Sequence, residues 1–224
     1  MQALSAQASG TNYSIKILAT ELPPYTFTEN EKPKGIILSP IMESAERNNT
    51  YIEVEFMPWQ RVLKELENNP GTFIVAMARS PEREKLYHWV APARKTRIGF
   101  ISYMNEHRHA EGDEDHLFND RICVEAKTPM DNWISKRPYK NVVMTTSSFS
   151  CMKALQTGRV DYWLTDETLA HYTMQHHKGQ PEHLIFHHKI MEPVLYISTS
   201  LKTSQDVVEH MRVLLSTSDL DAPE

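Results

Sequence analysis

The chain has 224 residues, of which 40% are hydrophobic, and it carries a formal net charge of −5 at pH 7. This length fits one large domain or two of about 100 residues, with enough apolar side chains for a buried core. The acidic balance, with Lys and Arg scattered along the chain, argues against a nucleic-acid-binding protein. The lack of any apolar run of about 18 residues argues against a membrane span.

Strand and helix patterns alternate in the N-terminal part. Residues 51–56 alternate apolar and polar side chains, and residues 73–78 form the continuous apolar run of a strand buried on both faces. Ser39 and Pro40 predict the N-cap and first turn of a helix. The expected parallel β-α-β-α-β order, with right-handed crossovers, is a strand at 14–19, a helix from Ser39 to residue 49, a strand at 51–56, a helix from Pro58, and a strand at 73–78.

Arg83 follows the apolar strand at 73–78, in a charged segment. The strand breaks at Ser80-Pro81 into a charged turn of helix that contains Arg83. A guanidinium just past the carboxyl end of a buried strand lies where open α/β sheets bind ligands. Its planar set of five N–H donors matches a carboxylate, so Arg83 is the first candidate ligand-binding residue.

The same alternation continues to the C-terminus. Residues 105–116 form an acidic, histidine-containing segment that we expect to be a surface loop at the start of a second lobe. The expected elements are strands at 97–103, 121–125, 141–145, 159–164, 183–187 and 193–199, and helices from Thr128-Pro129, at 148–157, at 166–177 and at 204–215.

Three segments occur in an informative order: Glu21-Leu-Pro-Pro-Tyr25, Pro58-Trp-Gln-Arg61 and the stretch from Phe73 to Pro92. Together with the later segment Ala154-Leu-Gln-Thr-Gly-Arg-Val-Asp-Tyr-Trp-Leu-Thr-Asp166, they resemble the family 3 bacterial extracellular solute-binding proteins. Each piece alone is weak, and the ordered set is specific. The resemblance covers roughly residues 13–212.

The resemblance implies an α/β fold of the two-lobed type II periplasmic binding protein kind. Each lobe would be a mostly parallel sheet flanked by helices, with the ligand cleft at the hinge. It implies a discontinuous first lobe (13–102 and 190–224) and a second lobe at 103–189. Residues 1–12 are expected to be a disordered tail or, because Ala6-Gln-Ala8 has the small-residue pattern of a cleavage site, the remnant of a signal peptide.

The resemblance also assigns residues to ligand binding. Arg83 matches the arginine that grips a ligand carboxylate; the alternative is a surface arginine paired with Glu82 or Glu84. Asp166 matches the acid that pairs with a ligand ammonium; the alternative is an N-cap for the following helix. Thr128 and Lys127 lie at a helix start where relatives carry a Gly-Thr or Gly-Ser pair. Tyr25 and Trp59 would form aromatic walls of the ligand cleft, with Glu21 at its rim. The remaining candidates are Arg61 in the second helix and Ala78, where many amino-acid binders place a hydroxyl.

Several of these candidates have a structural alternative or depart from the family pattern. Core packing is the alternative for Tyr25 and, more strongly, for Trp59, and helix capping alone is the alternative for Thr128. Arg61 is either near the ligand or solvated. The lysine at 127 in place of glycine opposes a close approach of the backbone to the ligand, and its alternative role is to supply a positive charge. The loss of the hydroxyl at Ala78 weakens the case for an ordinary α-amino acid.

Metal and nucleophile chemistry have no support in the sequence. The eleven histidines lack zinc-ligand spacings, and no nucleophile motif or phosphate-binding glycine loop is present, so we expect no metal, no cofactor and no catalysis. Cys123 and Cys151 fall in one predicted lobe, where two buried free thiols are favoured over a disulfide.

The sequence therefore predicts a monomeric, exported periplasmic protein that captures a small carboxylate-bearing metabolite by hinge closure and delivers it to an ABC transporter permease. Two alternatives stay open. The same fold serves as the sensor module of signalling proteins, and it also hosts an enzyme of the cyclohexadienyl dehydratase type. In that enzyme Glu21 or Asp166 would have to act as the acid.

Overall fold

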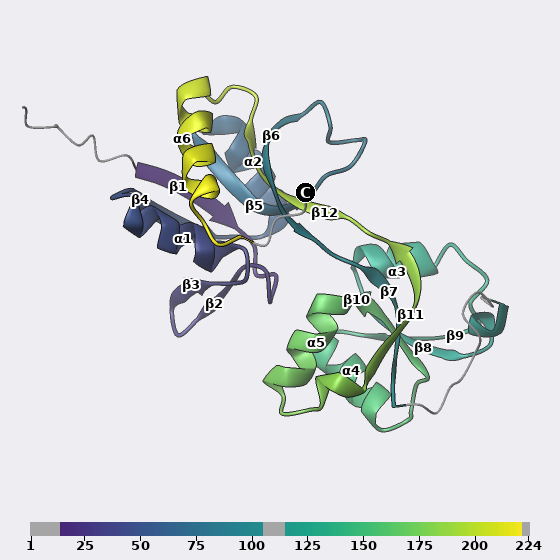
Figure 1. The fold of residues 1–224 in the computed structure, drawn as a ribbon. Coiled ribbons are helices and arrows are strands. Elements are labelled where there is room, and N and C mark those ends of the chain that lie inside the picture. Colours follow the sequence, from purple (N-terminus) through teal and green to yellow (C-terminus); the bar gives the residue numbers. More distant parts are fainter. Residues whose placement is uncertain (1–13, 105–114, 221–224) are drawn as a thin grey trace, which may run out of the picture. The chain divides into compact units, whose positions relative to one another are not determined.

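The computed structural model describes residues 14–104 and 115–220, and the chain separates into two compact units (Figure 1). The first unit contains the described residues up to Arg94 and those from Leu195 onward, and the second contains the described residues between Lys95 and Val194. The expected tail at 1–12 and nearly all of the expected loop at 105–116 lie outside the described residues.

The first unit is built on a five-stranded sheet with the order β4-β1-β5-β12-β6. β1 pairs in parallel with both β4 and β5, which confirms the predicted β-α-β-α-β arrangement, and β12 joins β5 in antiparallel orientation. The strands are β1 (Ser14–Ala19), β4 (Tyr51–Phe56), β5 (Thr72–Ala78), β6 (Tyr87–Lys95) and β12 (Val194–Ser200).

Helices cover both faces of this sheet. Ile17 and Leu18 are consecutive in β1 and therefore point to opposite faces. Ile17 packs in one core with residues of α1 (Leu38–Arg47) and α6 (Gln205–Ser216), whereas Leu18 packs in another with residues of α2 (Trp59–Asn68). The helices after β1 and β4 thus lie on opposite faces of the sheet.

Two details of the first unit differ from the sequence prediction. α1 begins at Leu38 with Ile37 as its N-cap, so the prediction of Ser39 as the cap was wrong. The Ser39 hydroxyl instead accepts a hydrogen bond from the Gly35 N–H at 3.1 Å, which ties the first turn of the helix to the preceding loop. The expected turn of helix around Arg83 is a series of hydrogen-bonded turns over 81–86, not a helix.

Three strands of this unit were not predicted. β2 (Phe27–Glu29) and β3 (Lys32–Lys34) form a short hairpin, too short to show a period. β6 lies at the edge of the five-stranded sheet and contains Pro92, which an edge strand tolerates because its outer N–H groups need no partner. Its neighbour is β12, more than one hundred residues later, so no local pattern could have revealed the pairing.

The second unit has a five-stranded sheet with the order β11-β7-β10-β8-β9. β10 and β9 flank β8 in parallel, and β7 is antiparallel to β10 and β11. The strands are β7 (Ile98–Tyr103), β8 (Arg121–Glu125), β9 (Asn141–Thr145), β10 (Tyr162–Asp166) and β11 (Leu184–Met191). The helices are α3 (Pro129–Ile134), α4 (Ser148–Gln156) and α5 (Glu167–His176), with 3-10 turns at Asp115–Phe118 and Pro181–His183.

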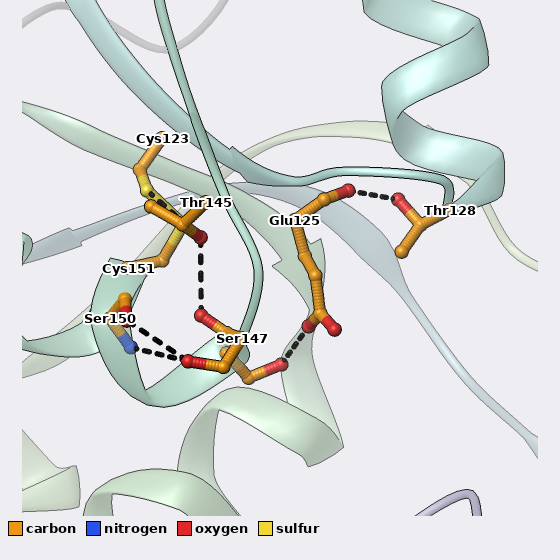
Figure 2. Close-up of a disulfide and its surroundings, with 8 residues drawn as sticks. Cys123, Glu125, Thr128, Thr145, Ser147, Ser150 and Cys151 are labelled. Atoms are coloured by element: carbon orange, nitrogen blue, oxygen red, sulfur yellow. Dashed lines mark hydrogen bonds between the residues drawn. A yellow bond between two sulfur atoms is a disulfide. The ribbon is translucent and has the colours of Figure 1, made fainter.

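A disulfide joins Cys123 of β8 to Cys151 of α4, with 5.5 Å between the two Cα atoms (Figure 2). The prediction of two free thiols was therefore wrong. Both side chains are fully buried. The packing of α4 on β8 brings the two Cα atoms into the range that a disulfide needs, and sequence spacing carries no information about that packing.

Among the helices of the described residues, none is long and apolar enough to cross a lipid bilayer. The described residues also contain no group of three or more His, Cys, Asp or Glu side chains arranged to hold a metal ion.

Candidate functional site

Arg83 lies in the turns that follow β5 and is held on two sides. Its Nη1 donates a hydrogen bond to the Ala78 carbonyl oxygen at 3.1 Å, and its guanidinium carbon lies 5.0 Å from the ring centroid of Trp59. The side chain is half-buried. These contacts fix the guanidinium and use one of its five N–H donors, so a planar cation is positioned just past the carboxyl end of a buried strand.

Of the two partners that the surface-arginine alternative named for Arg83, Glu84 binds Arg79 instead. The other, Glu82, is exposed, and its pKa is lowered first by a hydrogen bond with Ser80 and also by the charge of Arg83.

Arg79 Nε lies 2.8 Å from one Glu84 oxygen and Nη2 lies 2.5 Å from the other. The Arg79 guanidinium also lies over the rings of Trp89 and Tyr196. The hydrogen bonds with Glu84 are the largest cause that raises the pKa of Arg79 above its ordinary value. The same hydrogen bonds lower the pKa of Glu84.

The structure thus brings Trp59 of α2 together with Ala78 and Arg83, which belong to the segment that follows it along the chain. The Ala78 main chain supplies the acceptor for Arg83, so its lack of a hydroxyl does not remove it from this group. Trp59 begins α2, is half-buried, and also packs against the core around Leu18, so both of its proposed roles are compatible.

The other candidates of the first unit have local structural contacts. The exposed carboxylate of Glu21 accepts hydrogen bonds from the Thr28 N–H at 3.1 Å and the Thr28 hydroxyl at 2.7 Å, tying the segment after β1 to the hairpin. Tyr25 is only 4% exposed and belongs to the main core, the placement that the packing alternative describes. Arg61 is exposed and, after the larger effect of Lys16, contributes to lowering the pKa of Glu55.

Asp166 ends β10 and caps α5. One carboxylate oxygen accepts the Leu169 N–H at 2.9 Å, and the other accepts a hydrogen bond from the Thr96 hydroxyl. The residue is only 7% exposed. The capping role is therefore observed, whereas the ligand role stays a prediction.

Replacing Asp166 with alanine is expected to lower the free energy of unfolding by about 1–2 kcal/mol, because α5 loses its N-cap and Thr96 loses its acceptor. Asn keeps an oxygen that can cap the helix, so Asp166→Asn should retain most of this stability. Urea unfolding of both variants measures the effect. Equal stability of Asp166→Ala and the parent would show that the cap contributes nothing.

Thr128 and Lys127 form the start of α3. The Thr128 hydroxyl donates to the Glu125 carbonyl at 2.7 Å (Figure 2). The same oxygen accepts the Asp131 N–H at 3.2 Å, which is the capping contact. Lys127 is exposed and has a φ of 64°, and its N–H donates to the Asp131 carboxylate at 2.8 Å. A lysine here adopts the left-handed conformation that a glycine reaches without steric cost.

Glu125 was not among the predicted site residues, although it is the last residue of a correctly predicted strand. Its carboxylate accepts a hydrogen bond from the Ser148 hydroxyl at 2.6 Å, at the start of α4 (Figure 2). The available signal was an acidic residue at the end of the strand predicted at 121–125. The helix that supplies Ser148 comes from a later part of the chain, so the partner was not predictable.

Comparison with known proteins relates this chain to bacterial solute-binding proteins. The family "Bacterial extracellular solute-binding proteins, family 3" matches residues 15–108, which confirms the resemblance over that part of the chain. No curated protein matches the chain.

Solved structures extend the likeness to nearly the whole chain, at low sequence identity. An ancestral cationic amino acid solute-binding protein has a TM-score of 0.76 at 14% identity, with 91% of this chain and 88% of that chain covered. A histidine kinase sensor domain with similarity to periplasmic binding proteins has a TM-score of 0.67 at 17% identity, covering 92% and 90%. The arginine-bound form of truncated ArgBP from T. maritima has a TM-score of 0.64 at 18% identity, covering 91% and 95%. The fold is that of the type II periplasmic binding proteins.

Proposed function

We propose that this protein is an extracytoplasmic solute-binding protein that captures a small carboxylate-bearing metabolite through Arg83. The observation that carries the proposal is the guanidinium itself. It lies past the carboxyl end of β5, half-buried, and is fixed by the Ala78 carbonyl and the face of Trp59. A cation fixed in this way has lost side-chain freedom before the ligand arrives, so less entropy is lost on binding.

The proposed cycle has each unit contacting a different end of the ligand. Hydrogen bonds to a charged group contribute about 1.5–3 kcal/mol each. Shifting a two-state hinge from mostly open to mostly closed requires about 5.5 kcal/mol of differential affinity. A ligand that makes charged contacts with both units supplies that energy, whereas contacts with one unit leave the equilibrium unchanged.

An amino acid or close relative is the simplest ligand. Support comes from the structural neighbours, which include arginine-bound ArgBP and the substrate-binding protein of an amino acid ABC transporter. Export fits the family, which is described as extracellular, and the buried disulfide fits an oxidising compartment. The ligand would then pass to an ABC transporter permease.

A thermal-shift screen with amino acids, polyamines, small carboxylates and sugars tests the proposal. Carboxylate-bearing compounds should raise the melting temperature, since binding the native state alone stabilises it. Binding should also change Trp59 fluorescence, because that ring contacts the Arg83 guanidinium. Stabilisation by sugars or polyamines, with silence across the carboxylates, would overturn the carboxylate assignment.

A sensor module is the second candidate, and one observation favours it. The histidine kinase sensor domain matches 92% of this chain. The two functions share the ligand site and differ in the step after ligand capture. Sequencing the gene and its neighbours separates them: a permease gene next to this one supports transport, whereas a reading frame continuing into a membrane helix and a kinase supports sensing.

A further inference from the structure

The buried strand β5 contains one residue in the left-handed backbone conformation. Ala76 has a φ of 62° and is only 7% exposed, within the main core of the first unit. Among the strand residues of the described ranges, 14–104 and 115–220, it is the one with a positive φ. A residue that has a Cβ adopts this conformation at a steric cost, whereas glycine adopts it freely. A conformation that the surrounding structure maintains against such a cost points to a functional role.

The pairing of β5 with β12 shows that Ala76 belongs to a β-bulge. Met77 pairs with Tyr196 and Ile74 pairs with Ser198, with a register shift between the two pairs. Moving from one pair to the other takes three steps along β5 and two along β12. β5 therefore has one residue more than its partner matches, which is what defines a bulge. A left-handed residue occurs in one common type of bulge, where it is usually glycine.

The packing of the β5 side chains identifies Ala76 as the extra residue. In a regular strand, successive side chains alternate between the two faces of the sheet. Val75 and Ala76 are consecutive, yet both pack in the core shared with α1 and α6. Met77 packs in the opposite core, shared with α2, and Ala78 packs again on the side of α1 and α6. The alternation is regular if Ala76 is left out of the count.

The bulge lies directly before the group that holds Arg83. Ala78 is two residues after Ala76, and its carbonyl oxygen accepts the hydrogen bond from Arg83 Nη1 at 3.1 Å. Met77 lies in the same core as Trp59, whose ring centroid is 5.0 Å from the guanidinium carbon. Both contacts of Arg83 therefore depend on the direction in which β5 ends. A bulge bends its strand and increases the local twist, so it sets that direction.

We infer that Ala76 is a positioning residue for Arg83: its left-handed conformation maintains the bulge that directs the end of β5, so that the Ala78 carbonyl and the Trp59 ring hold the guanidinium. This inference rests on the proposed function and adds the feature of the fold that orients the cation before a ligand arrives. A cation fixed in advance loses less freedom when it binds a carboxylate. Without the bulge, the end of β5 would be straighter and the carbonyl acceptor would move relative to Arg83.

Two variants remove the bulge in different ways. Ala76→Val places a β-branched side chain where the left-handed conformation is strongly disfavoured. Deletion of Ala76 removes the extra residue and leaves the neighbouring side chains on their present faces with their present β12 partners. Two further variants are controls. Ala76→Gly should keep the bulge, because glycine reaches a φ of 62° without steric cost. Ala93→Val adds the same two methyl groups to the same core from β6, at a residue without a positive φ.

The first measurement needs no ligand. In protein labelled with fluorinated tryptophan, each of the four tryptophans gives a fluorine NMR signal, and Trp59→Phe identifies that of Trp59. Arg83→Ala shows where this signal lies when the ring has lost its cation. We expect Ala76→Val and the deletion variant to move the Trp59 signal at least halfway to that position. Ala76→Gly and Ala93→Val should leave it unchanged.

The second measurement is titration calorimetry with L-arginine, L-glutamate, L-leucine and succinate. For the compound that binds the parent most tightly, Ala76→Val and the deletion should weaken the affinity about ten- to hundredfold, as expected for the loss of a hydrogen bond to a charged group. Ala76→Gly should stay within about twofold of the parent. Ala93→Val should lower stability by overpacking and also keep the affinity within about twofold. Far-UV circular dichroism reports whether each variant folds.

The outcomes separate failure of the inference from failure of the proposed function. The inference is overturned if Ala76→Val and the deletion variant fold and keep the Trp59 signal and the affinity of the parent. It is also overturned if Ala76→Gly or Ala93→Val changes them as much, since the effect would then come from packing. If neither variant without the bulge folds, the bulge is a requirement of the fold and the inference is overturned as well. If none of the four compounds binds the parent, the proposed function fails, while the Trp59 signal still decides whether Ala76 positions Arg83.

Discussion

Arg83→Ala is expected to weaken the binding of carboxylate ligands by roughly a hundred- to ten-thousandfold. Two charge-assisted hydrogen bonds to the ligand would be lost, each contributing about 1.5–3 kcal/mol. The cost in stability should be small, because the fold loses one hydrogen bond to the Ala78 carbonyl, the contact with the Trp59 ring and a charge interaction with exposed Glu82. At about 1 kcal/mol, the melting temperature should fall by only about 2–4 °C. Calorimetric titration and thermal unfolding measure the two effects separately.

Arg79 provides the matched control. It lies four residues earlier in the same segment, but its guanidinium is engaged by Glu84 and by two aromatic rings. Arg79→Ala should lower stability and leave ligand affinity within a fewfold of the parent. Arg83→Lys keeps the charge and loses the planar fork, so its affinity should fall between those of the parent and Arg83→Ala. A large loss of stability with unchanged affinity in Arg83→Ala would show that Arg83 is structural.

Removing the disulfide by the double substitution Cys123→Ala and Cys151→Ala is expected to lower the free energy of unfolding by about 3–4 kcal/mol. The two cysteines are 28 residues apart, and a crosslink over such a loop restricts the unfolded chain by about this amount. The melting temperature should fall by about 7–14 °C. Guanidinium unfolding followed by tryptophan fluorescence gives the free energies, and Trp163, buried in the core that contains the disulfide, reports on the second unit.

Reduction of the parent protein is the companion measurement. Both sulfur atoms are fully buried, so dithiothreitol should act slowly on the folded protein and quickly once denaturant opens the second unit. The reduced parent and the double variant should then unfold at similar denaturant concentrations. If the oxidised and reduced proteins unfold at the same concentration, the disulfide does not contribute to stability.

Local sequence patterns were enough to predict the elements whose signal is local. Four such elements were predicted correctly: β5 from its apolar run, β4 from its alternation, and the helix starts at Pro58 and Thr128. In each case the order of apolar, polar and helix-starting residues along a short stretch is enough, because it depends only on which neighbouring side chains are buried and which are exposed. Arg83 was placed after β5 for the same reason, since its position depends only on the strand immediately before it. The ordered motifs that resemble the solute-binding family then supplied the fold class.

Contacts between distant segments could be known only from the folded chain. The pairing of β6 with β12, the disulfide, and the anchoring of Glu125 by Ser148 each join residues that are far apart in the chain. Asp166 shows the same limit, because its local context predicts a cap but gives no sign of Thr96, seventy residues earlier. A local pattern records whether a side chain is buried. The partner that a buried side chain contacts is set by how the elements pack against one another, and that packing depends on residues throughout the chain.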